Sequence, residues 1–394
     1  MSKSNPEIII SSFPLQKSFM LGSVAKNKLV PDAFTKSQNL YLKTWREQSV
    51  QNATWGETWN WICPESLNVV ASHFLEIQLP ALSENNSYKA VPGLYCIDTI
   101  KLLSNGSEVY ELDFKTYMRE FLSSMRDTEE FTDFVNCYLG GATASLDART
   151  ISLPLMLPNS HYLRRHSNRG YGCFPHRLSS KLEFQIKMGA GAEVVTAVSA
   201  APASIANSAK VVTREIKGDA NAIIRKYSDA RGIYSICVPR YQTIVPWTAG
   251  TANTLQSIKA TLPTGSVYEI VFEAYPSAIT LEHTNRLNIT TPDIIRVQCD
   301  GEYVRVLDNK VRCEQELFSN GFRSNASCNN AGRVCFGDQV AYSDHCYQGA
   351  IHCGNISSIT LEVQFGENVN WRALAKKYSK VRIQSNGILR SSLE

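Results

Sequence analysis

Hydrophobic and polar residues alternate with a period of two along several stretches of the chain. In KLEFQIKM (181–188) apolar side chains occupy every second position, with charged or amide side chains between them. The segments 74–79, 267–275 and 357–365 repeat the pattern. A strand points successive side chains to opposite faces of its sheet, so this alternation is typical of a strand with one buried and one wetter face. The pattern therefore predicts a mainly β protein.

Two short turns indicate how these strands connect. Asn105-Gly106 separates the strand-like segments IKLLS and SEVYELDF, and Asp300-Gly301 separates IIRVQC and EYVRVL. Both dipeptides readily adopt positive φ at both central positions, as a two-residue hairpin requires. Antiparallel pairing follows, since a parallel α/β sheet would need a helix between successive strands.

Helical spacing appears in one region. Apolar residues in 114–125 recur at intervals of three and four, after Asp113 as the expected N-cap. A second amphipathic stretch, 131–139, stops at Gly140-Gly141. Because strands flank this region, we expect these helices to be short decorations on a β scaffold.

The length and one change of composition predict the domain organisation. At about 150 residues per domain, 394 residues indicate two or three domains. Between about 189 and 210 the chain becomes rich in Ala and Ser, which favours a loop between two halves. We therefore predict an N-terminal arm over 1–48, a first β-sandwich over 49–210, and a second with a C-terminal tail over 211–394. Each half has room for about eight strands, although no sequence repeat relates them.

The composition is that of a folded chain, with 43% hydrophobic and 19% charged residues. A disordered chain would need lower hydrophobicity and higher net charge. A surface with few charges fits a protein that covers much of itself with partners. No apolar run is long enough for a membrane-spanning helix or a signal peptide, so we expect a soluble protein made in the cytosol.

The net charge of +4 is concentrated at one end. Residues 1–48 hold seven basic and three acidic residues, so the rest of the chain is balanced. A basic arm on a neutral body can contact nucleic acid or anionic lipid. The alternative is a solvated tail whose charge serves only solubility.

The cysteines give the best candidate for a metal site. The chain has 11 cysteines in no compact disulfide pattern, and we interpret most of them as reduced core residues. The candidate ligands are four cysteines and the histidines beside two of them: Cys328, Cys335, His345, Cys346, His352 and Cys353. Zinc sites are usually built from closely spaced pairs such as CxxC. The gaps here are wider, so we predict clustered loop cysteines and no metal ligand.

No motif for catalysis or cofactor binding is present: the chain lacks a GxxxxGK[ST] phosphate loop, an HExxH zinc helix and a GxSxG nucleophile elbow. The basic and aromatic stretch His161–Lys187 could bind nucleic acid, but it is interpreted as a polar loop leading into a strand. We therefore predict no catalytic, cofactor-binding or metal-ligating residue.

Carboxylates and tryptophans offer two further candidates. Glu269, Glu273 and Glu362 lie at outward positions of predicted strands, where a pair could hydrolyse glycosides at a suitable separation. Trp59 and Trp61, together with Trp55, could form a ligand platform. Alternation of Trp59 and Trp61 more often marks one buried strand face at a sheet edge, which is the interpretation we prefer.

The order of segments resembles a known family. TWNWICPESLNVVASHFLEIQLPAL followed by YCIDTIKLLSNGSEVYELDFKTYMREFL is similar to the first half of a double jelly-roll major capsid protein. ISLPLMLP and GCFPHRLSSKLEFQIKM resemble that family's paired strands around a long loop. In the second half, KATLPTGSVYEIVFEAY, AIHCGNISSITLEVQF and KKYSKVRIQSNGILR continue the likeness, which covers roughly residues 50–390. The family includes capsid proteins of nucleocytoplasmic large DNA viruses, virophages and polinton-like viruses.

The resemblance implies an all-β fold of two consecutive antiparallel eight-stranded jelly rolls. It also implies a structural protein, not an enzyme and without a cofactor. Such proteins form homotrimers with a pseudo-hexameric outline that tile an icosahedral shell. The implied partners are neighbouring capsomers, penton and minor capsid proteins, with the arm facing an inner membrane or the genome. The implied location is the virion, with assembly in the host cytoplasm or a viral factory.

Two alternatives stay open at this stage. The first is a minor capsid or vertex protein of the same lineage, although vertex proteins usually carry one jelly roll. The second is a carbohydrate-binding or carbohydrate-processing β-sandwich protein, which would need a concave face with tryptophans and carboxylates.

Overall fold

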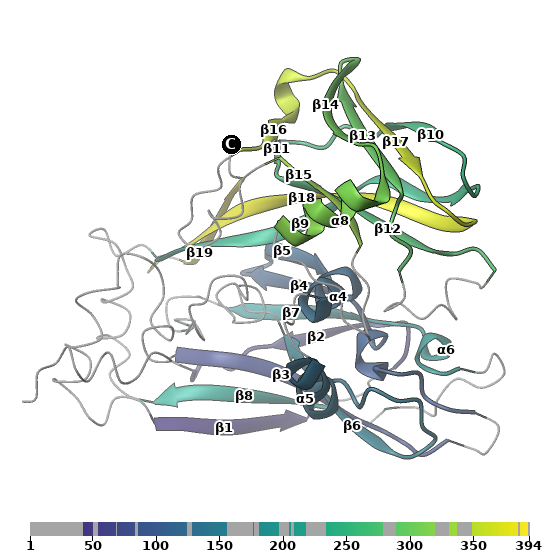
Figure 1. The fold of residues 1–394 in the computed structure, drawn as a ribbon. Helices are drawn as coiled ribbons and strands as arrows, with labels where there is room; N and C mark the ends of the chain where they lie inside the picture. The colour runs from purple at the N-terminus through teal and green to yellow at the C-terminus, as the bar shows by residue number, and fades with distance from the viewer. Residues whose placement is uncertain are drawn as a thin grey trace, which may run out of the picture.

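The computed structural model describes most of the chain. The described residues are 42–49, 54–67, 69–82, 86–123, 128–155, 176, 181–196, 205, 209–217, 234–278, 289–319, 331–336, 349–384 and 387–392. They form two β-sandwiches, one in the lower and one in the upper half of Figure 1. The chain is therefore all-β apart from short helices, as predicted. No helix within these ranges is both long and apolar enough to cross a membrane.

The first sandwich consists of two four-stranded sheets. One sheet has the order β1 (Leu42–Ser49), β8 (Ala209–Lys217), β3 (Val69–Leu79) and β6 (Arg149–Leu155). The other has the order β2 (Thr58–Ile62), β7 (Leu182–Met188), β4 (Ile97–Ser104) and β5 (Ser107–Asp113). All neighbouring pairs are antiparallel. If the strands of this roll are numbered in chain order, the strand order is 1-8-3-6 in the first sheet and 2-7-4-5 in the second.

The second sandwich repeats this topology. One sheet has the order β10 (Gln256–Ala260), β17 (Ile359–Gln364), β13 (Ile294–Cys299) and β14 (Glu302–Leu307). The other joins β9 (Tyr234–Gly250), β18 (Val369–Gln384), β12 (Glu269–Pro276) and β15 (Gly332–Cys335), and β19 (Gly387–Ser392) adds to the end of β18. The short pair β11 (Ser266–Val267) and β16 (Ile351–His352) lies apart. Without the short pair and β19, the order is again 1-8-3-6 and 2-7-4-5, so both halves are eight-stranded jelly rolls.

Short helices connect the strands. They are α4 (Phe114–Ser123), α5 (Thr128–Tyr138), α6 (Gly191–Val194), α8 (Lys310–Ser319) and the 3-10 turns η2 (Pro92–Leu94) and η6 (Cys353–Asn355). The two predicted helices correspond to α4 and α5. The Thr116 amide donates to Asp113 Oδ1 at 2.9 Å, which confirms the N-cap of α4. Positive φ at Gly140 and Gly141 follows the end of α5. The sequence analysis did not predict α8.

Burial confirms the predicted alternation in three of the four segments, whereas β12 is buried at every position from 269 to 275. In β7 the apolar positions are buried, while the polar positions between them stay partly or fully exposed. The β17 strand and the second half of β3 show the same alternation. Both predicted hairpins form, β4–β5 and β13–β14, with φ of 49° at Asn105 and 51° at Asp300 and positive φ at the glycine that follows each.

The pairing shifts two predicted boundaries. The β1 strand lies at the end of the predicted arm, yet it pairs with β8 along its whole length. The β8 strand lies almost entirely beyond the predicted limit at 210, yet it pairs with β3 of the first roll. The first roll therefore runs from β1 to β8. Pairing over more than 150 residues of sequence depends on the closed sandwich, which local composition does not reveal.

Candidate functional site

The outer face of β12 carries two glutamates that are almost completely buried. Ile270 and Phe272 belong to the core of the second roll, so Glu269 and Glu273, which flank them at alternate positions, point away from that core, as predicted. Both glutamates nevertheless expose only 1% of their surface. The outward face is not exposed to solvent, because Arg119 of α4 in the first roll donates to Glu273, and Arg333 and Lys376 of the second roll pair with Glu269.

Glu273 is held between cations from both rolls. Arg119 of α4 donates to Glu273 Oε1, and Arg372 of β18 donates from Nε to Oε2 at 2.6 Å. The same Arg372 reaches back to the first roll, where its Nη2 lies 3.1 Å from Asp113 Oδ2 and 2.8 Å from Thr116 Oγ1. Arg372 therefore links the start of α4 to the second roll.

Glu120, the next residue of α4, forms a second group of contacts. Its carboxylate lies 2.9 Å from Arg333 Nη2 and 3.2 Å from Lys376 Nζ. The Tyr241 hydroxyl of β9 donates to Glu120 Oε2 at 2.6 Å. Glu269 completes the group by pairing with both Arg333 and Lys376. Three strands of the second roll thus converge on one helical residue of the first.

We call these eight ionic side chains the junction network. Its members are Asp113, Arg119 and Glu120 from the first roll and Glu269, Glu273, Arg333, Arg372 and Lys376 from the second. Four cations face four carboxylates, so the network is neutral when every member is ionised. Buried charges are tolerated in proteins when they are paired in this way.

The electrostatics favour the ionised forms of Glu120 and Glu273. Burial alone would raise the pKa of Glu120, but the charges of Arg333 and Lys376 outweigh it and hold this pKa well below its usual range. For Glu273 burial is likewise outweighed, here by Arg372 and Arg119, and its pKa is also lowered. A general acid needs a raised pKa to keep its proton at neutral pH. The network is therefore suited to joining the rolls and unsuited to proton transfer.

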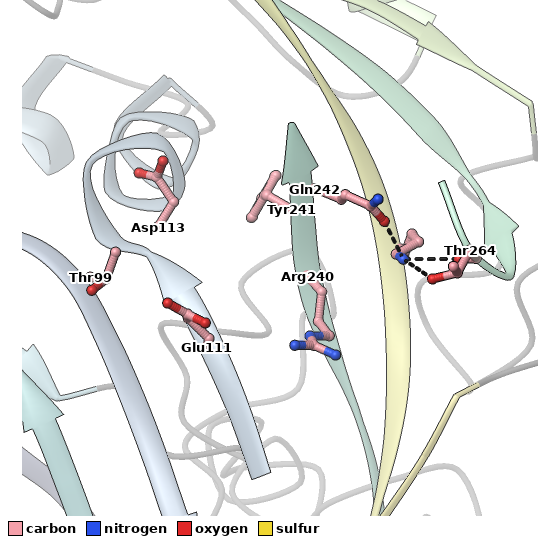
Figure 2. Close-up of a pocket in the computed structure, with 8 residues that line it drawn as sticks. Thr99, Glu111, Asp113, Arg240, Tyr241, Gln242 and Thr264 are labelled. Atoms are coloured by element: carbon pink, nitrogen blue, oxygen red, sulfur yellow. Dashed lines mark hydrogen bonds between the residues drawn. The ribbon is translucent and has the colours of Figure 1, made fainter. Parts of the chain in front are cut away.

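A cleft of about 350 Å³ opens beside the network, between β5 of the first roll and β9 and β18 of the second. Figure 2 shows the side chains that line it, which are Thr99, Glu111, Asp113, Arg240, Tyr241, Gln242, Thr264 and Lys377. Lys377 Nζ donates to Gln242 Oε1 at 2.6 Å and to the Thr264 carbonyl at 2.9 Å. Arg240 donates to Glu108 of β5 at 2.8 Å. The cations of the cleft are thus engaged in contacts within and between the rolls.

The other candidates from the sequence lie elsewhere. Trp59 and Trp61 are buried on one face of β2, which is an edge strand, so they form core and not a ligand platform. Glu362 accepts from Gln298 at 2.9 Å and lies 3.4 Å from Arg296 Nη1. It therefore belongs to a surface group on the second roll, away from Glu269 and Glu273 in the network.

Of the six metal candidates, the structure describes three, Cys335, His352 and Cys353. Cys335 and Cys353 are buried free cysteines, whereas Cys328, Cys346 and His345 lie outside the described residues. Within the described part of the chain, no three His, Cys, Asp or Glu residues are grouped to hold a metal ion. Of the stretch 161–187, the residues up to 175 also lie outside the described ranges, while His176 is buried.

Sequence reasoning missed Glu120 and all four cations of the network. Arg119 and Glu120 lie on the face of α4 opposite its apolar residues, which is where solvent is normally expected. The one available signal was on β18, where Arg372, Leu374 and Lys376 alternate charge with an apolar residue. That alternation is also typical of an ordinary exposed strand, so it did not single them out.

Comparisons with known proteins agree with the topology. No protein-family model and no curated protein matches the sequence. Among solved structures, PBCV-1 VP54, fitted into a reconstruction of the virophage Sputnik, is similar with a TM-score of 0.62 at 11% identity, over 92% of this chain and 100% of its own. The Faustovirus major capsid protein gives 0.61 at 8% identity, over 98% and 99%. The mavirus major capsid protein gives 0.57 at 8% identity, over 88% and 90%. The likeness spans both rolls at once, so the chain has the double jelly-roll fold of these proteins.

Proposed function

We propose that this chain, which has the double jelly-roll fold, is a structural major capsid protein that trimerises into pseudo-hexameric capsomers of an icosahedral viral shell. The single observation that carries the proposal is the pair of rolls with identical strand order, joined by a buried ion network. A hexagonal outline from three chains requires two similar bodies in each chain. It also requires that the two bodies keep a fixed relation to each other.

The junction network supports the second requirement. Within the junction network, four ion pairs cross from the first roll to the second: Arg119–Glu273, Glu120–Arg333, Glu120–Lys376 and Asp113–Arg372. Charge-assisted hydrogen bonds have defined distances and directions, so together they select one relative orientation of the rolls. A rigid two-roll unit is the geometry that a tile needs.

The partners follow from this role. The self-association is a homotrimer, and the trimer meets neighbouring capsomers, penton proteins and minor capsid proteins in the virion. Assembly takes place in the host cytoplasm or in a viral factory. The basic residues of 1–48 that precede β1 give this end of the chain a positive charge suited to an inner membrane or the genome.

The alternatives have less support. A vertex protein with one roll does not need a second, equal roll. For a glycoside-processing enzyme, the best carboxylate pair on β12 is buried and bound by arginines, with the pKa of Glu273 lowered. The tryptophans that would form a sugar platform are in the core. We therefore propose that the protein is not an enzyme and holds no cofactor.

Light scattering after size exclusion tests the proposal. The untagged full-length protein should elute as a stable species with the mass of three 43.9 kDa chains. Negative-stain images of that species should show a hexagonal outline. A monomer at micromolar concentration would contradict the proposed function, because the pseudo-hexameric tile depends on threefold association.

A further inference from the structure

The two rolls carry equivalent helices in unequal surroundings. Both α4 and α8 follow the fifth strand of their roll, and an Asx side chain caps each helix. Asp113 Oδ1 accepts from the Thr116 amide at 2.9 Å, and Asn309 Oδ1 accepts from the Arg312 amide at 3.0 Å. Yet α4 is buried at every position from 114 to 122, because its own roll covers one side and the second roll the other.

By contrast, α8 is covered on one side only. Cys313 and Leu317, four residues apart, are buried, whereas Val311 on the outer side is 61% exposed. The neighbouring strand β14 is an edge strand of its sheet and exposes Val304. We call this the α8 surface: Val304, Lys310, Val311, Arg312 and Glu314, all of which are exposed. It occupies the place in the second roll that α4 and β5 occupy in the first.

The face that receives α4 also has an equivalent. On the second roll, residues of β18 lie opposite residues of β12 in the pairs Arg372–Glu273, Leu374–Val271 and Lys376–Glu269. On the first roll, β8 lies opposite β3 in the pairs Lys210–Glu76, Val212–Phe74 and Arg214–Ser72. On the eighth strand of each roll, a cation, an apolar residue and a second cation therefore follow one another in the same order. A glutamate on the third strand lies opposite the first cation in both rolls.

The two receiving faces differ in exposure. The side chains of Glu273 and Arg372 retain 1% and 14% of their exposure beneath α4. The equivalent side chains of Glu76 and Lys210, 3.2 Å apart, retain 26% and 36%. The apolar middle of this face is covered from its own roll, where Phe74 stacks on Tyr138 of α5 at 5.6 Å. The charged margin stays accessible.

We propose that the α8 surface of one copy docks on the charged margin of β3 and β8 in a second copy. The proposed contact joins, between chains, the elements that correspond to α4 and its receiving face within the chain. The inference rests on the proposed function and specifies how its trimer is held. The donor and the receiver are different patches of the same chain, so the contact is head-to-tail and closes a ring when three copies have joined.

Two single substitutions on opposite sides of the contact test the proposal. Val311→Asp places a charge in the centre of the α8 surface, and Lys210→Glu places two carboxylates opposite each other on the receiving face. We expect each variant to lose the trimer and run at the mass of one chain. Leu255→Asp is the matched control, since Leu255 is 40% exposed on the same roll but outside the α8 surface. It should remain trimeric. Thermal unfolding of each isolated chain checks that the fold is intact.

Mixing the two variants distinguishes a head-to-tail contact from a symmetric one. The Val311→Asp chain keeps an intact receiving face, and the Lys210→Glu chain keeps an intact α8 surface. An equimolar mixture should therefore form a complex of two chains that cannot grow or close.

The outcomes separate the two proposals. Wild-type protein that is monomeric contradicts the proposed function itself. Wild-type trimers together with trimeric Val311→Asp or Lys210→Glu variants overturn this inference and leave the function standing. Two monomeric variants that fail to associate on mixing also overturn it.

Discussion

Removing one charge from the junction network should weaken the whole molecule. Glu120→Gln keeps the size of the side chain but deletes the charge that Arg333, Lys376 and Tyr241 contact. The two cations then share Glu269 as their nearest carboxylate. Breaking a buried ion pair from one side costs about 3–5 kcal/mol, since the partner is left buried without its counter-charge.

The size of the protein converts this cost into a melting temperature. At about 2.1 cal/mol/K per residue, unfolding 394 residues carries an entropy of about 0.8 kcal/mol/K, so the loss corresponds to about 4–6 °C. Differential scanning calorimetry of the purified protein measures this shift. Glu111→Gln is the matched control, because Glu111 pairs with Lys101 at 3.3 Å on the surface, where an ion pair contributes at most about 1 kcal/mol.

A double-mutant cycle makes the test specific to the network. Lys376→Met removes one of the cations that Glu120 holds, so the double variant again has balanced charge. We expect its loss of stability to fall short of the sum of the two single losses by about 1–3 kcal/mol. A melting temperature of Glu120→Gln within about 1 °C of the wild type would refute the reasoning, as would strict additivity in the cycle.

The remaining predictions concern pH and one glycine. Burial lowers the pKa of His176 to about 4, so the contribution of this neutral histidine to stability is complete above about pH 6.5 and is lost as the pH falls from there toward 4. Burial together with His176 also lowers the pKa of His73, which makes stability fall with pH in the same direction. The melting temperature should therefore fall between pH 7 and 5, and fall less in His176→Gln; an unchanged value across that range would contradict the assignment. The lowered pKa values of Glu120 and Glu273 add a second loss below about pH 4. A β-carbon at Gly189 would occupy the space of the Tyr95 carbonyl oxygen, whereas one at Gly354 meets nothing within 4 Å. Gly189→Ala should lower the free energy of unfolding in urea by at least about 2 kcal/mol, whereas Gly354→Ala should leave it nearly unchanged. Equal unfolding midpoints for the two variants would show that the backbone at 189 moves to accommodate the β-carbon.

The strands and turns could be predicted from the sequence because their signals are local. In β7 every apolar residue faces the core of the first roll, so the alternation in the sequence coincides with the observed burial. Asn105-Gly106 and Asp300-Gly301 form their turns through their own backbone preferences. Helix α8 escaped prediction because Cys313 and Leu317 are the only buried residues among 310–317, the part of the helix whose side chains the structure describes. Two buried apolar residues over that stretch leave no clear helical period, and the Asn309 cap was the remaining signal.

The junction could not be predicted because alternation does not say what lies against the polar face of a strand. On β7 that face meets water, and on β12 it meets another domain with complementary charges. Both faces carry glutamate, Glu183 on β7 and Glu269 and Glu273 on β12. Deciding between them requires knowing that Arg119 and Glu120 arrive from a helix about 150 residues earlier in the chain. Such information is carried by the tertiary structure alone.

The same limit explains why no repeat was found between the halves. The likeness of the two rolls lies in strand order and in three cross-strand pairs on β8 and β18, at alternate positions, in segments whose intervening residues differ. When the two halves are compared along the sequence, these equivalent residues are only scattered single matches. In the sheet these matches become one surface, because the register aligns Lys210 with Glu76 as it aligns Arg372 with Glu273. Among the described residues, the charges are buried on the β12–β18 face but stay partly exposed on the β3–β8 face. This asymmetry between equivalent faces is the physical reason to expect a second copy on the exposed charges.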